Sequence, residues 1–269
     1  MCIRDRGNIA RVQKLCSSGG FNLTKFVCNN PVVVDSIPLS KQSSQTTKDL
    51  SKGDSIERAL GVHWHLETDE FQFKITMKDS PLTKRGILST ISSIYDPLGI
   101  AGPFILAGRK ILQQISALKD GWDTPVPQEL SNSWIKWRQN IPLLEQINIP
   151  RCYKPVKFGA VVHRSLHTFS DASEVGYGVA CYLRQVDSNG QVSVSLVLGK
   201  SRVSPLKLVT IPRLELTAAA LAVRLSAMVK KELMMPNIQD IYWTDSKIVL
   251  GYIFNHTKRF RVFVANRVQ

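Results

Sequence analysis

The chain has 269 residues, of which 43% are hydrophobic, and 35 lysines and arginines against 21 acids give it a formal net charge of +14. This size and hydrophobic content exclude a disordered tail and are sufficient for one large or two ordinary folded domains. A basic excess of this size favours contact with a polyanion, of which nucleic acid is the commonest soluble example, although a need for solubility explains the charge equally well.

The cysteines and the least polar stretch of the chain argue against several other classes of protein. The five cysteines lie far apart without a Cys-x-x-Cys motif, which argues against a disulfide framework and a zinc site and favours a reducing intracellular compartment. The N-terminal residues are too polar for a secretory signal. The stretch 86–108 is interrupted by glycine and proline and falls short of the roughly 20 continuous apolar residues of a membrane span. We therefore expect no membrane partner.

The N-terminal part of the chain predicts a helix, an extended segment and a loop. Apolar residues at helical spacing predict a helix that ends at Gly19. These residues are Ile9, Val12 and Leu15. An extended segment is predicted for 21–34, around Pro31, and an exposed loop for the polar stretch 41–52. Residues 1–6 match nothing that follows and are left out of these predictions.

A hairpin and three amphipathic helices are predicted next. Alternation of apolar and polar residues predicts two strands, 62–66 and 71–77, around a turn at 67–70. The first helix should end before Asp96 and Pro97. The apolar stripes of the three helices are Ile87, Ile91 and Ile94, then Ile111, Ile115 and Leu118, then Leu130, Trp134, Trp137 and Ile141. The tryptophans could stack on bases, but a stripe at helical spacing favours packing in a core.

From about residue 161 the pattern changes to strands. The order strand, strand, strand, helix, strand, helix predicts a mixed α/β fold, in which a three-stranded meander is joined by a crossover helix to a fourth strand. The predicted elements are strands 166–170, 177–183, 192–198 and 238–243, a hairpin turn at 187–190, and helices 212–233 and 246–254.

Three acids stand out in this part of the chain. Asp171 ends the first strand, Glu215 lies near the start of the long helix, and Asp245 follows the fourth strand. If the first and fourth strands are adjacent, the three carboxylates meet at one sheet edge and form a magnesium site. Two such ions can activate water and stabilise the leaving oxygen of a phosphodiester. Taken alone, Asp171 and Asp245 are better explained as helix or turn caps, and Glu215 as a complement to the helix dipole, so that only the joint placement of the three acids favours the metal site.

The chain resembles the Pao (Bel/Pao) class of long-terminal-repeat retrotransposon polyproteins. The resemblance covers nearly the whole chain after residue 7, and its motifs follow one another in the right order. The segments that carry it are 60–62 (Leu-Gly-Val), 83–89 (Thr-Lys-Arg-Gly-Ile-Leu-Ser), 95–99 (Tyr-Asp-Pro-Leu-Gly), 168–173 (Thr-Phe-Ser-Asp-Ala-Ser), 212–216 (Pro-Arg-Leu-Glu-Leu), 243–246 (Trp-Thr-Asp-Ser) and 265–268 (Ala-Asn-Arg-Val).

The resemblance implies three segments. Residues 1–110 correspond to the C-terminal part of a reverse transcriptase, with the palm end, a primer-grip-like hairpin and thumb-like helices. Residues 111–160 form a helical connection, and 161–269 a ribonuclease H-like domain truncated at its C-terminus. The implied fold is a ribonuclease H-like mixed sheet with flanking helices, preceded by an α+β reverse transcriptase remnant.

The resemblance also implies an activity and its partners. A ribonuclease H-like domain cleaves the RNA strand of an RNA–DNA hybrid with two Mg²⁺ ions, for which Mn²⁺ is a possible substitute. Asp171, Glu215 and Asp245 would be its catalytic and metal-binding residues. The expected partners are the hybrid or another nucleic acid and the remainder of the Pol polyprotein, in the cytoplasm, a virus-like particle or the nucleus.

Two departures from the family pattern bear on activity. No Tyr-x-Asp-Asp motif is present, so the chain is not expected to polymerise by itself. No acid follows Asp245, whereas family members carry a fourth carboxylate in an Asn-Pro-Ala-Asp-like segment, which would lie beyond Gln269. With three carboxylates we expect weak metal binding and little or no activity.

Two other functions compete with the nuclease. Families of this kind are also labelled as peptidases, but an aspartic peptidase needs a glycine after Asp-Thr or Asp-Ser, and neither 171–173 nor 245–247 provides it. The second alternative is a non-catalytic module that binds template and primer through phosphate contacts, although a solvated surface explains the same basic residues. The candidate nucleic-acid-binding residues are Arg213, Lys247, Lys258, Arg259, Arg261 and Arg267.

Overall fold

The structure is a computed structural model that describes residues 2–42, 56–59, 62–255, 257 and 259–268. Contacts divide the chain into two compact units, Met1–Lys74 with Glu145–Cys152 and Ile75–Leu144 with Tyr153–Gln269. The predicted borders at residues 110 and 160 concern the identity of domains, which this division does not test, so they stay a prediction.

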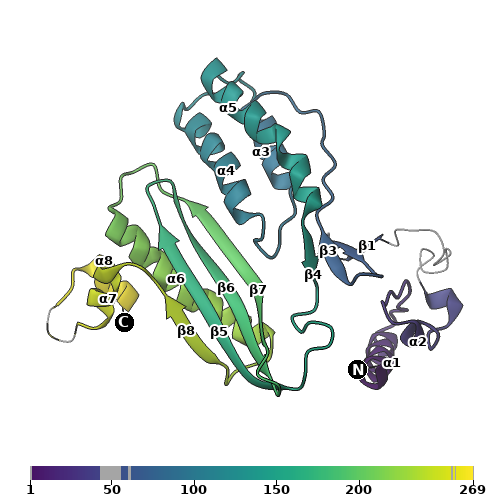
Figure 1. Cartoon of the computed structure of the whole chain (residues 1–269). Coiled ribbons are helices and arrows are strands. Elements are labelled where there is room, and N and C mark those ends of the chain that lie inside the picture. Colours follow the sequence, from purple (N-terminus) through teal and green to yellow (C-terminus); the bar gives the residue numbers. More distant parts are fainter. Residues whose placement is uncertain (1, 43–55, 60–61, 256, 258, 269) are drawn as a thin grey trace. The chain divides into compact units, whose positions relative to one another are not determined.

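In its described residues, the first unit contains two helices, a 3₁₀ turn and a four-stranded antiparallel sheet in the order β1-β2-β3-β4 (Figure 1). Its elements are α1 (Cys2–Ser18), α2 (Pro31–Val34), η1 (Leu39–Lys41), β1 (Ile56–Ala59), β2 (Val62–His65), β3 (Glu70–Gln72) and β4 (Asn148–Pro150). The predicted helix before Gly19 is confirmed, and it begins at Cys2, within the segment that the predictions left out.

Two N-terminal predictions differ from the structure. The extended segment predicted for 21–34 is wrong at its end, because Pro31 lies in the first turn of α2, where its missing N–H costs nothing. Asn30 caps this helix, since its Oδ1 accepts the N–H of Val32 at 3.0 Å. From residue 43 on, the loop predicted for 41–52 lies outside the described residues.

The predicted hairpin is confirmed, but its second strand is shorter than expected. The alternation in the sequence runs to Met77, whereas β3 ends at Gln72. Gln72 pairs with His63 on one side and Asn148 on the other, and β4 offers no partner further along. The next apolar residue, Phe73, is buried without belonging to the sheet. The alternation of apolar and polar residues after Gln72 therefore indicates burial rather than strand pairing.

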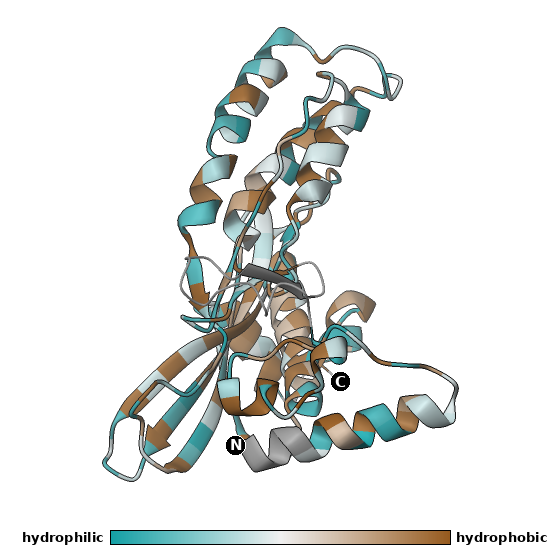
Figure 2. Ribbon diagram, turned by 90° about the vertical axis from the view of Figure 1, so that its right-hand side faces the viewer, coloured by the Kyte–Doolittle hydropathy of each residue, from teal (hydrophilic) through white to brown (hydrophobic). Residues whose placement is uncertain are grey.

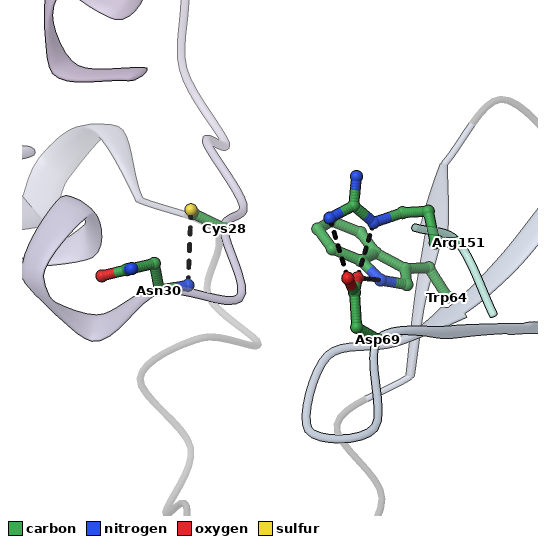
Figure 3. Close-up of polar contacts among 5 residues, drawn as sticks. All are labelled: Cys28, Asn30, Trp64, Asp69 and Arg151. Atoms are coloured by element: carbon green, nitrogen blue, oxygen red, sulfur yellow. Dashed lines mark hydrogen bonds and ion pairs between the residues drawn. The ribbon is translucent and has the colours of Figure 1, made fainter. Parts of the chain in front are cut away.

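A polar cluster closes the β2–β3 turn (Figure 3). Asp69 has a left-handed φ of +56°, and its carboxylate accepts the indole N–H of Trp64 at 3.0 Å. The guanidinium of Arg151, directly after β4, donates to both oxygens of Asp69 at 2.5 and 3.0 Å and lies 5.0 Å from the Trp64 ring centroid. The bidentate ion pair and the cation–π contact tie the turn to β4.

The helices of the second unit carry most of the predicted apolar stripes, but Leu118 is 45% exposed just after the second helix, and Ile141 lies in a 3₁₀ segment after the third. They are α3 (Lys84–Ser93), α4 (Gly102–Ala117) and α5 (Gln128–Gln139), followed by the 3₁₀ segment η2 (Ile141–Gln146). Trp134 and Trp137 are 3% and 7% exposed, which confirms that they pack in a core. Within the described ranges, no helix combines the length and apolar character that crossing a membrane requires.

The second unit also contains a four-stranded mixed sheet in the order β7-β6-β5-β8, flanked by helices (Figure 1). Strands β5, β6 and β7 form an antiparallel meander, and β8 runs parallel to β5. The elements are β5 (Val161–Ala172), β6 (Gly176–Asp187), β7 (Val192–Val203), α6 (Ile211–Glu232), β8 (Gln239–Trp243), α7 (Lys247–Ile253) and α8 (Val262–Val268). The predicted mixed α/β fold is confirmed, and α8 was not predicted.

Helix α6 covers one face of this sheet. Apolar residues on that face alternate with outward-facing residues along the strands, an alternation that Figure 2 shows as brown and teal bands. The shared core consists of Leu166, Val179, Cys181, Leu183, Val197, Ala222, Leu225 and Val229. One face of the sheet is therefore buried by α6, and the functional side chains must be sought on the other face or at the strand ends.

The segment between α3 and α4 closes the free edge of β7. Gly99, with a left-handed φ of +70°, lies directly against the backbone of Gly199, whose N–H donates to Leu98 O at 2.7 Å. Ser201 Oγ donates to Gly102 O at 3.0 Å. These contacts occupy backbone groups that an edge strand otherwise leaves open, and they join the helices to the sheet.

Candidate active site

Strands β5 and β8 end side by side at one edge of the mixed sheet. Their last paired residues are Phe169 and Trp243, and two positions further along each chain lie Asp171 and Asp245. Because the strands are parallel, the two exposed acids emerge at the same edge and line one groove. The predicted adjacency of the first and fourth strands is confirmed.

Glu215 reaches the same region from α6. Its half-buried side chain accepts a hydrogen bond from Ser246 Oγ at 2.5 Å. The Ser246 hydroxyl also accepts the N–H of Val249 at 3.2 Å and so caps the N-terminus of α7. The alternative in which Asp245 caps this helix is wrong, because its neighbour Ser246 does so. One buried hydroxyl thus connects Glu215 to the residue that follows Asp245.

The three acids offer the right chemistry for a divalent cation, but the structure does not gather them into one group of ligands. Asp171 accepts the N–H of its neighbour Ala172 at 2.7 Å. Among the residues that the structure describes, no group of three or more histidine, cysteine, aspartate and glutamate side chains is arranged so that it could hold a metal ion. Their hard carboxylate oxygens suit Mg²⁺ or Mn²⁺. A joint metal site of Asp171, Glu215 and Asp245 therefore stays a prediction.

A groove of about 840 Å³ adjoins the two strand-end acids. Its floor is the sheet face opposite α6, with the side chains of Phe169, Tyr182 and Trp243, and Lys200 of β7 also lines it. One wall is formed by the start of α4 and the residues before it, namely Gly99, Ile100, Gly102, Pro103 and Leu106. The helical segment and the sheet thus build the groove together.

The aromatic residues beside the acids were not among the predicted site residues. Phe169 and Trp243 are 44% and 47% exposed, and their rings are parallel within 8° with centroids 5.7 Å apart. A signal for them exists in the sequence, because 169–171 and 243–245 share one pattern of an aromatic residue, a hydroxyl residue and an aspartate. Alternation along a strand places such an aromatic residue on the same face as the acid two positions later.

His167 extends the aromatic row. The indole N–H of Trp243 donates to His167 Nδ1 at 3.1 Å, which requires this nitrogen to be unprotonated. Burial, together with the nearby positive charge of Arg184, lowers the pKa of His167 below its ordinary value. The ring is therefore neutral at neutral pH, where it holds the Trp243 indole in place.

The predicted nucleic-acid-binding residues occupy different surroundings. The guanidinium groups of Arg213 on α6 and Arg267 on α8 lie 5.1 and 3.8 Å from the Phe263 ring centroid. Lys258 lies outside the described residues. The other members of the set are exposed, namely Lys247, Arg259 and Arg261. Cation–π contacts orient two of the arginines, while the nucleic-acid contacts of the whole set stay a prediction.

Replacing Ser246 with alanine tests the connection between Glu215 and α7. We expect the free energy of unfolding to fall by about 1 kcal/mol, because the helix cap is lost. Ser246→Thr retains the hydroxyl and should lose less. Urea denaturation followed by circular dichroism measures both. Equal losses for the two variants would show that packing around this buried residue, rather than its hydroxyl, matters.

Comparison with known proteins gives a family match and distant structural likenesses. The family model described as the Pao retrotransposon-like RNaseH-like domain matches residues 83–246, which include all three acids. No curated protein matches. Among solved structures, the foamy viral protease-reverse transcriptase in complex with double-stranded DNA is similar at 14% identity and a TM-score of 0.22. That alignment covers 79% of this chain and 42% of the viral chain, and a likeness at this TM-score carries no argument here.

Proposed function

The chain belongs to the family of Pao retrotransposon-like RNaseH-like domains, and from this premise we propose that it hydrolyses the RNA strand of an RNA–DNA hybrid. The predicted resemblance to Pao retrotransposon polyproteins is confirmed by the family match. The observation that carries the proposal is the parallel register of β5 and β8, which brings Asp171 and Asp245 to one edge of the sheet. The bond from Ser246 to Glu215 supports a third carboxylate beside them.

The proposed chemistry uses the carboxylates as ligands. Asp171, Glu215 and Asp245 would hold two Mg²⁺ or Mn²⁺ ions, which when bound supply an activated water and stabilise the leaving oxygen of the phosphodiester. Ser246 would orient Glu215 through its hydroxyl. The exposure of both aspartates at an open groove supports access by a polymer rather than by a small enclosed ligand.

The basic side chains would bind the backbone of the hybrid. Arg213 lies two residues before Glu215, and Lys247 two residues after Asp245, so each cation is close in the chain to a proposed ligand. Contacts of this kind fix the register of the nucleic acid without reading its bases. The RNA strand would be distinguished from DNA by its 2′-hydroxyls and by the shape of the minor groove.

A cleavage assay with Asp171→Asn tests the proposal. We expect the wild-type chain, with three carboxylates, to cleave a labelled RNA–DNA hybrid slowly and only when Mg²⁺ or Mn²⁺ is present. Asp171→Asn should lower this rate at least about 100-fold, because a neutral amide is a poor ligand for a hard cation. Ser246→Ala should lower it by about 10- to 100-fold, as is usual for groups that orient a metal ligand. Glu174→Gln is the control, since Glu174 is an exposed acid of the same region outside the groove lining. Wild-type cleavage that is absent, or that survives in Asp171→Asn, would contradict the proposal.

One observation favours a second function, binding without cleavage. No group of three potential ligands gathers among the described residues, which fits a module that only binds nucleic acid. The two functions differ in their response to ions. A metal site raises the melting temperature when Mg²⁺ is added. A purely electrostatic binding surface instead loses affinity steeply with salt and shows no specific Mg²⁺ effect.

A further inference from the structure

The sheet face opposite α6 carries a row of partly exposed aromatic rings. Phe169 and Trp243 are register partners on adjacent strands, and their parallel rings are each close to half exposed. The ring of His167 continues the row beyond Trp243, with centroids 6.0 Å apart, and Tyr182 meets Phe169 edge to face at 5.8 Å. Exposed apolar surface of this kind, rimmed by polar groups, marks an interaction site.

The charges around this row indicate the chemistry of its occupant. Arg184 lies two residues along β6 from Tyr182, on the same face of the strand, whereas Lys200 of β7 pairs with Val179 of the core and belongs to the face that α6 covers. The acids that line the groove are Asp171 and Asp245, at the ends of the strands. An anionic polymer is therefore attracted by Arg184 at one end of the aromatic row, and at the other end it meets the carboxylates, where a divalent cation would neutralise them.

We propose that this groove binds an unpaired nucleic-acid strand, with bases stacked against Phe169 and Trp243 and the sugar–phosphate backbone running from Arg184 toward Asp171 and Asp245. The inference rests on the proposed function and deepens it, because it names the form of nucleic acid that the site takes. In a duplex the bases cover one another and present only their edges, so rings on a sheet cannot stack on them. Unpaired strands expose the base faces, and four-stranded sheets with exposed aromatic residues are known to stack two or three bases.

The upstream helices gain a role in this arrangement. Pro103 and Leu106 of α4 face the sheet across the groove. They close the groove on the side away from β5 and β8, the strands that carry the acids. A sheet without this wall would offer an open surface to the bases. The helical segment therefore contributes to binding although it carries none of the predicted catalytic residues.

Fluorescence anisotropy with a short single-stranded DNA tests the proposal on the full chain in Mg²⁺ buffer. DNA is the probe because the proposed activity does not cleave it. We expect Phe169→Ala and Trp243→Ala to weaken binding by about 5- to 150-fold each, the range for loss of a stacking ring. Binding of a blunt DNA duplex should change less than about twofold. The matched control is Tyr242→Ala, since Tyr242 is 45% exposed and adjacent to Trp243 but does not line the groove.

A second measurement needs no variant and so does not depend on variant folding. Irradiation of the wild-type chain with a strand that contains 5-iodouracil should crosslink to the peptides with Phe169 or Trp243. Crosslinks elsewhere, together with unchanged affinity in both variants, would overturn the proposal. Loss of self-association in Trp243→Ala with unchanged DNA affinity would also overturn it and assign the row to a protein contact. If the chain cleaves the hybrid but does not bind the single strand, only this inference is contradicted. If it binds the single strand but does not cleave the hybrid, only the proposed nuclease activity is contradicted.

Discussion

Replacing Gly99 with alanine is expected to lower the free energy of unfolding of the second unit by about 3 kcal/mol. Two costs add. A non-glycine residue at a φ of +70° costs about 1–2 kcal/mol. A Cβ at this position would lie 2.0 Å from the carbonyl oxygen of Gly199, a distance at which backbone must move, and such overpacking costs about 1–3 kcal/mol.

Gly190→Ala separates these two costs. Gly190 has a φ of +79°, but nothing lies within 4 Å of a Cβ built on it. Its substitution therefore carries the backbone cost alone. Urea denaturation of both variants, followed by circular dichroism, should show a difference of about 2 kcal/mol. Equal losses would mean that the contact between Gly99 and β7 does not hold the helices on the sheet.

The contact between Gly99 and Gly199 of β7 explains why the family match extends beyond the ribonuclease H-like sheet. The match begins at residue 83, and the N-cap of α3 is Thr83. The helices that follow belong to the same compact unit as the sheet, because the segment 95–99 closes the edge of β7. Within this segment Asp96 Oδ1 accepts the N–H of Ile100 at 2.9 Å, while burial raises the pKa of Asp96 against the effect of that bond. The segment 95–99 is thus a turn that docks the helices onto β7.

Local patterns predicted the elements of the second unit well. The strands of its sheet and the helix α6 follow from alternation and from helical spacing, because each buries one face against a neighbour. The position of Asp171 and Asp245 could be predicted only conditionally, since the pairing of β5 with β8 joins residues more than 70 positions apart. Sequence patterns specify which face of a strand is buried, but they do not specify its partner strand.

Other features depend on long-range contacts that the sequence does not reveal. The end of β3 at Gln72 is set by β4, a three-residue strand that lies far along the chain. The choice of Ser246 rather than Asp245 as helix cap depends on where α7 begins, and either residue type is a good cap. The sequence does not predict the aromatic groove, because the exposure of Phe169 and Trp243 depends on which face of the sheet α6 covers.

Replacing Trp137 with alanine is expected to cost about 3–5 kcal/mol of unfolding free energy, the usual range for a buried tryptophan. Trp137 on α5 is 7% exposed and packs between Phe104 of α4, on which it stacks, and Trp134, against which it is tilted, with centroids 4.9 Å apart in both pairs. Its indole N–H donates to Phe104 O at 2.9 Å. A Cβ on Gly108 would lie 2.5 Å from the indole ring, so the two helices pack closely at this residue.

Two further substitutions resolve what the Trp137 side chain contributes. Trp137→Phe retains a ring but removes the donor to Phe104 O, and we expect it to cost about 1–3 kcal/mol through the smaller ring and the buried carbonyl left without this partner. Trp122→Ala is the exposed control, since Trp122 is 51% exposed, and it should cost less than about 1 kcal/mol. Denaturation curves with unchanged slopes would attribute the differences to stability alone.

The consequence for function follows from the position of Phe104. It lies directly after Pro103, which lines the groove, so Trp137 holds the groove wall in place from the side of α5. Trp137→Ala should therefore also weaken single-strand binding at temperatures where the sheet remains folded, whereas Trp122→Ala should not. Strand affinity that is unchanged in a folded Trp137→Ala chain would show that the sheet binds the strand without the helical wall.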